Sequence, residues 1–217
     1  MNQTLRMRLL LFVFACGMGN YAVANIAANE LLLQSAREGS IEGVQAALDK
    51  GADPNWYAGK RFNEKPICIA TLNGNFPLLV MLLDAGADPN VSYFYESDIF
   101  SKSPLGCAAN SKNLEAYKLL HDRGAELDRD LCTTCDSSKI RTNALTYTLG
   151  GDKFDILRYI LEHYNPTEGQ IRGLLHRVEN LAVYQDDKTL DDREWIAEWL
   201  RDRGHEVIPR EPWPARQ

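Results

Sequence analysis

The sequence predicts an all-α solenoid of about five helix-turn-helix repeats with extended loops between them. Two near-identical segments carry this prediction, Leu-Asp-Lys-Gly-Ala-Asp-Pro-Asn at 48–55 and Leu-Asp-Ala-Gly-Ala-Asp-Pro-Asn at 83–90. Their glycines, Gly51 and Gly86, are 35 residues apart, and Gly124 follows after 38 more. A period of this length is typical of stacked helix pairs, because one pair cannot bury its apolar face alone.

A short segment that favours a helix opens three of the repeats. Residues 65–70 read Lys-Pro-Ile-Cys-Ile-Ala, residues 103–108 read Ser-Pro-Leu-Gly-Cys-Ala, and residues 143–148 read Asn-Ala-Leu-Thr-Tyr-Thr. Pro66 and Pro104 suit a first helical turn, where a missing N–H costs nothing. The segments resemble the Thr-Pro-Leu-His-x-Ala signature of the ankyrin-repeat family. The resemblance implies an ankyrin-repeat solenoid over nearly the whole mature chain and protein binding as its activity.

An apolar stripe predicts the second helix of each repeat, most clearly over residues 76–83. Gly51, Gly86 and Gly124 then lie where such a helix ends in a left-handed residue. Residues 155–165 supply the corresponding segment of the fourth repeat, in which Tyr164 stands in for the glycine.

These segments divide the chain into three parts. The repeat domain spans residues 25–208, with repeats at about 29–57, 64–92, 102–130 and 142–166 and a modified C-terminal cap at 167–208. The cap pairs residues 171–178 with residues 195–200 through a polar connection at 185–192. Residues 209–217 form a proline-rich tail, because closely spaced prolines exclude a helix.

The first 24 residues predict an export signal. Arg6 and Arg8 precede the apolar run 9–15, and Ala-Val-Ala at 22–24 follows as a cleavage site. The run is shorter than the roughly 20 residues that cross a bilayer, so we expect no membrane span. In a competing interpretation residues 13–16, Val-Phe-Ala-Cys, form a bacterial lipobox that anchors the chain through a lipid on Cys16. We favour cleavage after residue 24 and release into the periplasm.

The charge balance restricts the class of partner. The formal net charge is -6, and removal of the first 24 residues, which contain two arginines and no acid, makes it -8. An acidic chain is poorly suited to hold nucleic acid or anionic lipid by charge. It favours a basic partner, because opposite charge speeds the encounter.

Aromatic residues gather in the loops between repeats, which lie beside the concave binding face in the ankyrin-repeat family. Aromatic side chains dominate interface hot spots. The expected partner-binding residues are Trp56, Tyr57, Phe62, Tyr93, Phe94, Tyr95 and Phe100. The alternative is that these rings cover the ends of their own helices. We expect a monomeric chain that binds one folded protein.

Cys132 and Cys135 form a Cys-x-x-Cys pair in the third loop. Such a pair can be a redox motif, half of a zinc site or a local disulfide. The redox motif normally lies at a helix N-terminus, and zinc needs four ligands where this chain offers no second pair. In an oxidising compartment the disulfide is favoured. Cys68 and Cys107 are expected to be small buried hydrophobes.

No motif for catalysis is present in the sequence. The histidines, His121, His163, His176 and His205, lie near helix ends or on polar faces and form no recognisable constellation. We expect no catalytic residue, metal or cofactor. The expected function is that of a periplasmic interaction module, an immunity or inhibitor protein for a toxin or effector. The alternatives are an accessory protein of a periplasmic enzyme and a redox or metal protein using Cys132 and Cys135.

Overall fold

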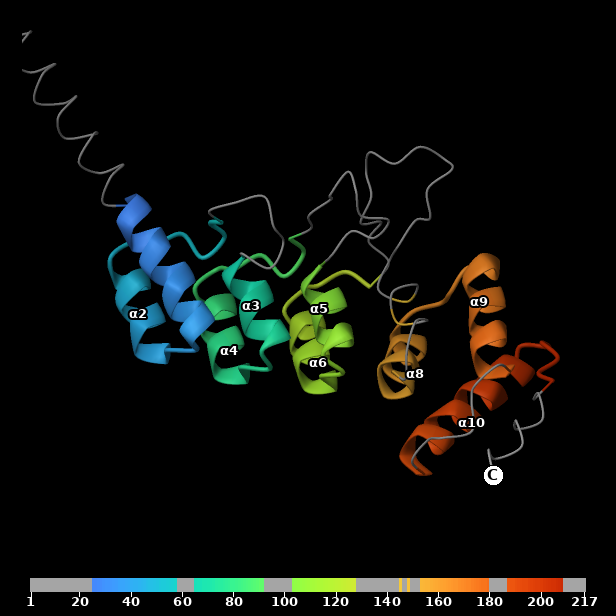
Figure 1. Cartoon of the computed structure of the whole chain (residues 1–217). Helices are drawn as coiled ribbons and strands as arrows, with labels where there is room; N and C mark the ends of the chain where they lie inside the picture. Colours follow the sequence, from blue (N-terminus) through green and yellow to red (C-terminus); the bar gives the residue numbers. More distant parts are fainter. Residues whose placement is uncertain are drawn as a thin grey trace, which may run out of the picture. The chain divides into compact units, whose positions relative to one another are not determined.

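The computed structural model describes residues 25–57, 65–91, 103–127, 145, 148, 153–179 and 187–208, the side chains of 187–190 excepted. All regular structure in these ranges is helical (Figure 1), which confirms the all-α prediction. No helix in these ranges is both long and apolar enough to span a membrane. The chain divides into two compact units, Met1–Asp88 and Pro89–Gln217.

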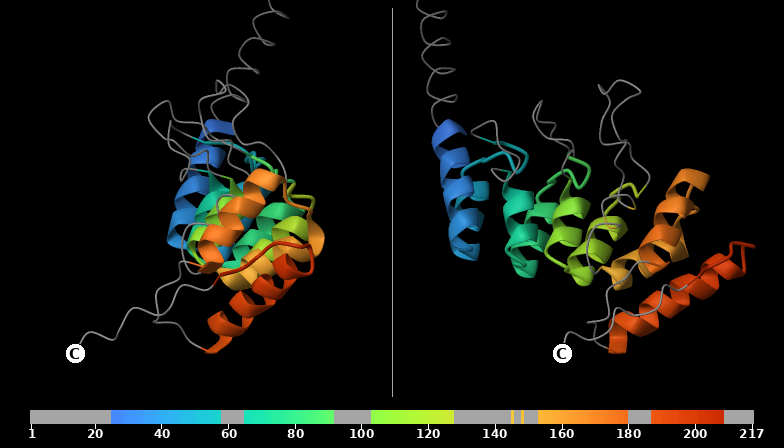
Figure 2. Two further views of the ribbon diagram at one scale, coloured as in Figure 1. Left: turned by 90° about the vertical axis from the view of Figure 1, so that its right-hand side faces the viewer. Right: turned by 45° about the vertical axis from the view of Figure 1, so that its right-hand side comes forward.

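The N-terminal unit consists of paired helices. They are a helix over residues 25–38, α2 (Ile41–Asp49), α3 (Pro66–Leu72) and α4 (Phe76–Asp84). Helices α3 and α4 lie side by side, and α2 packs against α4 (Figure 2). Leu32, Val44, Leu78 and Leu82 are fully buried between these helices. The unit therefore contains two of the expected repeats.

The C-terminal unit contains the remaining repeats. Its helices are α5 (Pro104–Asn110), α6 (Leu114–Asp122), α8 (Phe154–His163), α9 (Glu168–Glu179) and α10 (Asp187–Arg201). Helix α5 pairs with α6, α6 contacts α8, and α10 packs against both α8 and α9. Leu145 and Thr148 are buried helical residues, as the degenerate first segment of the fourth repeat predicts.

Side-chain caps fix where four of these helices begin. The side-chain oxygens of Ser40, Asn75, Ser103 and Asn113 each accept a hydrogen bond from the backbone N–H three residues on, at 2.9–3.2 Å. Such caps satisfy amide groups that have no partner inside the helix. The first residues of α3 and α5 are prolines, as the sequence predicts.

Left-handed residues occur where the glycine spacing predicts them. Gly51, Gly86 and Gly124 have φ values of 80°, 90° and 91° after α2, α4 and α6. A second set of left-handed residues separates the two helices of a repeat. In the second repeat this residue is Gly74 (φ 65°), but in the third it is Lys112 (φ 53°). Lys112 thus adopts the left-handed backbone conformation, which costs roughly 1 kcal/mol for a residue other than glycine.

Replacing Lys112 by glycine is expected to raise the free energy of unfolding of the C-terminal unit by about 0.5–1 kcal/mol. The substitution removes the backbone strain, and it also removes a positive charge near Lys153. The pKa of Lys153 is lowered by burial and by the charges of Lys112 and Arg177. Urea unfolding measures the change. Lys112→Ala, which removes the charge but keeps the strain, is the control; an equal gain with alanine would contradict the backbone explanation.

Asparagine side chains join successive repeats. Asn55 accepts a hydrogen bond from the Asp88 N–H at 2.7 Å and donates from Nδ2 to the Gly86 carbonyl at 3.0 Å. In the C-terminal unit Asn90 makes the same pair of bonds, to the Glu126 N–H at 2.8 Å and the Gly124 carbonyl at 2.7 Å. The last residue of the Gly-Ala-Asp-Pro-Asn segment is therefore the link from one repeat to the next.

We expect Asn55→Ala to lower the free energy of unfolding of the N-terminal unit by about 1–3 kcal/mol, because two inter-repeat hydrogen bonds are lost together. The measurement is urea unfolding followed by helical circular dichroism. Asn73→Ala, at an exposed position at the end of α3, should change stability by less than about 0.5 kcal/mol. Similar effects at both positions would argue against the proposed link.

Two details at the C-terminal end differ from the sequence interpretation. Tyr164 occupies the expected glycine position but is extended, with φ -142° and ψ 137°, because a bulky side chain disfavours the left-handed conformation. The connection expected at residues 185–192 is wrong for residues 187–192, which belong to α10.

Candidate protein-binding surface

A hydrogen-bonded turn positions the first two aromatic residues of the expected binding surface. Asp53 accepts from the Asn55 N–H at 2.9 Å through its carboxylate and from the Trp56 N–H at 3.0 Å through its backbone carbonyl. Asn29, from the helix at 25–38, accepts the Asp53 N–H at 2.7 Å. The turn is thus fixed to the helical scaffold. It leaves Trp56 half-buried and Tyr57 with 42% of its surface exposed.

Lys65 lies against the exposed ring. Its Nζ is 4.6 Å from the centroid of the Tyr57 ring, within cation–π range. Lys65 occupies the N-cap position of α3 without capping it through its side chain. Burial lowers the pKa of Lys65, while the nearby Cys68, Asp88 and Asp53 act in the opposite direction. The ammonium group is therefore partly desolvated, and the nearby carboxylates favour its charged form.

Trp56, Tyr57 and Lys65 can together serve as an anchor for a protein partner. The aromatic rings offer large apolar area, and the ammonium and the exposed Asp53 and Asp88 offer polar contacts beside it. Sequence reasoning missed Lys65, whose only signal was its place directly before Pro66 at the start of a helix. The rest of the expected set, Phe62, Tyr93, Phe94, Tyr95 and Phe100, lies outside the described residues, as do Cys16, Cys132 and Cys135.

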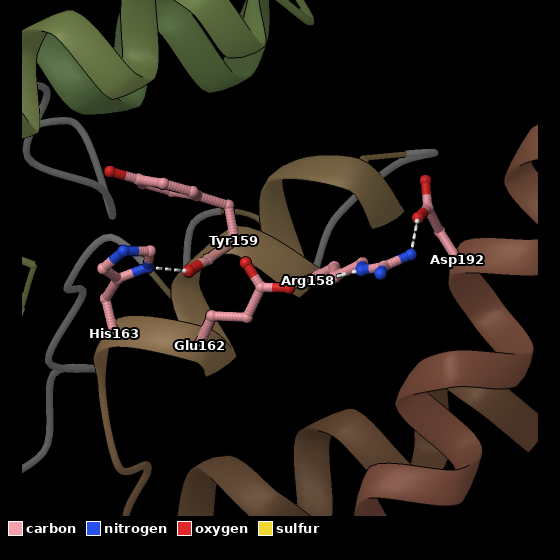
Figure 3. Close-up of polar contacts among 5 residues, drawn as sticks. All are labelled: Arg158, Tyr159, Glu162, His163 and Asp192. Atoms are coloured by element: carbon pink, nitrogen blue, oxygen red, sulfur yellow. Dashed lines mark hydrogen bonds and ion pairs between the residues drawn. The ribbon is translucent and has the colours of Figure 1, made fainter.

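A second polar cluster lies in the C-terminal unit. The Tyr159 hydroxyl is 2.8 Å from Nδ1 of His121, and Nδ1 of His163 is 2.7 Å from the Tyr159 backbone carbonyl. The two imidazole rings are 5.4 Å apart between centroids. Figure 3 shows Tyr159 and His163 on one side of α8 and Arg158 directed the other way, toward Asp192. No constellation among the histidines is recognisable in the sequence, and the stacking of α8 on α6 creates this one.

Burial and the neighbouring His163 lower the pKa of His121, while Asp122 acts against them. The folded state therefore binds fewer protons at this group than the unfolded state does. We expect the stability of the C-terminal unit to fall as the pH drops through about 6.5, the ordinary histidine value, and down to the folded pKa of His121.

The pH dependence can be measured by urea unfolding across pH 5–8. His121→Gln, which keeps a polar group but cannot titrate, should flatten it. An NMR titration that places the pKa of His121 at or above 6.5 would contradict the expectation.

The described ranges contain two buried thiols, Cys68 and Cys107, as expected from the sequence. Within the same ranges no group of three or more histidine, cysteine, aspartate or glutamate residues could hold a metal ion.

Comparison with known proteins agrees with this architecture. The family model "Ankyrin repeats (3 copies)" matches residues 32–131. The chain is 34% identical over 97 residues to cyclin-dependent kinase 4 inhibitor B of Rattus norvegicus and to that of Mus musculus, and 32% identical to that of Bos taurus. Each match covers 45% of this chain and 69% of the relative. The chain therefore belongs to the ankyrin-repeat family and is a protein–protein interaction module.

Proposed function

We propose that the chain is exported and binds one folded protein through a surface centred on Trp56, Tyr57 and Lys65, without catalysing a reaction. The main support is the Tyr57 ring, which is exposed on a turn held by hydrogen bonds and carries the Lys65 ammonium 4.6 Å from its centroid. A fixed aromatic anchor loses little conformational entropy on binding. We infer that the surface continues into Phe62 and the segment 93–100.

The proposed compartment is the periplasm. The support is the arrangement of Arg6, Arg8 and the apolar run 9–15 before an Ala-Val-Ala site. In that compartment Cys132 and Cys135 would form a disulfide. The mass of the intact exported chain shows whether it is cleaved after residue 24. The mass after treatment with an alkylating reagent, without prior reduction, shows how many thiols are free to react. A lipid on Cys16, or two modified thiols in this pair, would contradict the proposed cleavage and disulfide.

The proposed consequence of binding is inhibition, as by an immunity protein that neutralises a toxin or effector. The relatives are named as inhibitors of a kinase, and their similarity to this chain lies in the repeats. The net charge of -8 that remains after removal of the first 24 residues favours a basic partner. The partner is accordingly an exported basic protein whose activity falls when the chain binds. A rise in that activity would instead indicate the accessory role.

The test compares binding by the wild-type chain and by Tyr57→Ala. A partner captured from the exported fraction of the source cells is purified, and its affinity for both forms is measured by calorimetry together with its activity. We expect Tyr57→Ala to weaken binding by about 10- to 100-fold, as for a hot-spot aromatic. The set Tyr93, Phe94 and Tyr95, changed together to alanine, should weaken it further.

The matched control is Ile208→Ala, because Ile208 is exposed at 60% and lies in the other unit. It should leave the affinity unchanged. Unchanged affinity in Tyr57→Ala, with the helical fold intact, would place the partner elsewhere on the chain. Failure to capture any specific protein from the exported fraction would count against the whole function.

A further inference from the structure

Helix α4 has an apolar surface on both of its sides. Leu78, Leu79, Leu82 and Leu83 are buried in the N-terminal unit. The outward positions are apolar too, because Phe76 and Pro77 are exposed and Val80 and Met81 are half-buried. Only Asp84 among its nine residues is polar. A helix that is apolar all round normally has both sides covered.

The corresponding helices of the neighbouring repeats do not share this feature. Pro77 and Val80 correspond to Glu42 and Gln45 in α2, and to Glu115 and Lys118 in α6. Those polar side chains meet water, as expected of a solvent-facing helix. The repeat architecture therefore does not require apolar residues at these positions.

The apolar residues of α4 line a groove against α2. The groove has a volume of about 540 Å³, and its apolar lining includes Leu48, Pro77, Val80 and Met81. Pro77 and several other lining residues are exposed, so the groove is open to solvent. Open apolar grooves can take the side chains of a docked protein segment, and methionine adapts to irregular apolar surfaces.

Negative charge is concentrated at one end of the groove. Asp49 and Asp84 are the last residues of α2 and α4, and both line it. Gln45 donates a hydrogen bond to the Asp49 carboxylate at 2.8 Å. Neither helix has a basic residue in its last turn, although helix C-termini favour cations there. Lys50, which follows Asp49, is exposed and is not among the lining residues.

We propose that this α2–α4 groove is a second docking site, which takes a partner segment carrying leucine-like side chains beside an arginine or lysine. The apolar side chains pack on Val80 and Met81, and the cation lies between Asp49, Asp84 and the two helix C-termini. This site is separate from the Tyr57 surface and does not depend on the function proposed for it. It would let the chain hold two protein segments at once.

Met81 provides a direct probe of the groove. The chain has four methionines, and the other three lie within residues 1–24. The methyl group of Met81 can be observed by NMR in the full chain labelled with ¹³C-methyl methionine, and Met81→Leu assigns its signal. The ligand is the synthetic peptide Ac-Ser-Leu-Arg-Leu-Arg-Ser-NH₂. The comparison peptide has citrulline, which is neutral and of the same shape, in place of each arginine.

We expect the arginine peptide to shift the Met81 signal saturably and the citrulline peptide to bind about five- to tenfold more weakly, as for the loss of about 1 kcal/mol of charge attraction. Val80→Lys should abolish the shift, and it should fold because α6 carries a lysine at the matching position. Gln34→Lys, which adds the same charge at an exposed position of the helix at 25–38, should leave it unchanged.

Three outcomes would overturn the proposal. The first is a Met81 signal that neither peptide shifts, and the second is equal binding of the two peptides. The third is a Met81 signal that changes with protein concentration in the absence of peptide, with Val80→Lys removing that dependence. The last outcome would mean that a second copy of the chain occupies the groove. None of these outcomes bears on the affinity of the Tyr57 surface.

Discussion

Replacing Phe154 by alanine is expected to lower the free energy of unfolding of the C-terminal unit by about 3–5 kcal/mol. Phe154 is the first residue of α8 and retains only 1% of its surface exposed. The Arg177 guanidinium lies 5.6 Å from its ring centroid, so the substitution removes both the apolar packing and this contact. Urea unfolding, with a probe in each unit, gives the magnitude and shows which unit is affected.

Phe76 supplies a matched control, because it is the first residue of α4 but is 41% exposed. Phe76→Ala should lower the free energy of unfolding by only about 1 kcal/mol, because much of this ring is already in contact with water. The same substitution at the same helical position thus gives two different results, and burial is the difference. Equal effects at the two positions would contradict the packing described for α8.

Most of the fold could be predicted from the sequence, because the repeats use local signals. Pro66 and Pro104 mark helix starts, and Gly51, Gly86 and Gly124 mark helix ends, whatever surrounds them. Burial could not be predicted in the same way. Phe76 and Phe154 have equivalent helical positions in the sequence, and only the packing of neighbouring helices decides which ring is covered.

The candidate sites were less predictable, because they depend on contacts between residues far apart in the sequence. Aromatic composition identified Tyr57, whereas the contribution of Lys65 depends on the fold that places the start of α3 beside the Tyr57 ring. His121 and Tyr159 are 38 residues apart and meet only when α6 and α8 stack. The apolar stripe at residues 76–83 was visible in the sequence, but a stripe alone does not reveal that some of its residues lie on a second, exposed side of α4.

Arg158→Met is expected to lower the free energy of unfolding of the C-terminal unit by about 2 kcal/mol. Arg158 bonds to Asp192 on α10 at 3.2 Å and to Glu162 on α8 at 3.4 Å, and it lies 4.9 Å from the Trp195 ring centroid. Asp192 is only 7% exposed, and loss of its partner leaves an unpaired charge with little access to water. This expected loss of unfolding free energy is smaller than for a fully buried ion pair, because Arg158 itself is half-exposed.

Two further variants separate the charge from the packing. Glu162→Gln removes the other carboxylate, which is exposed, and should cost less than about 0.5 kcal/mol. Asp192→Asn in the Arg158→Met background should recover about 1 kcal/mol, because a neutral amide is less costly to bury than an unpaired carboxylate. If this second substitution brings no recovery, the loss in Arg158→Met comes from the Trp195 contact. In that case the link between α8 and α10 is mainly one of packing, and Asp192 contributes little to it.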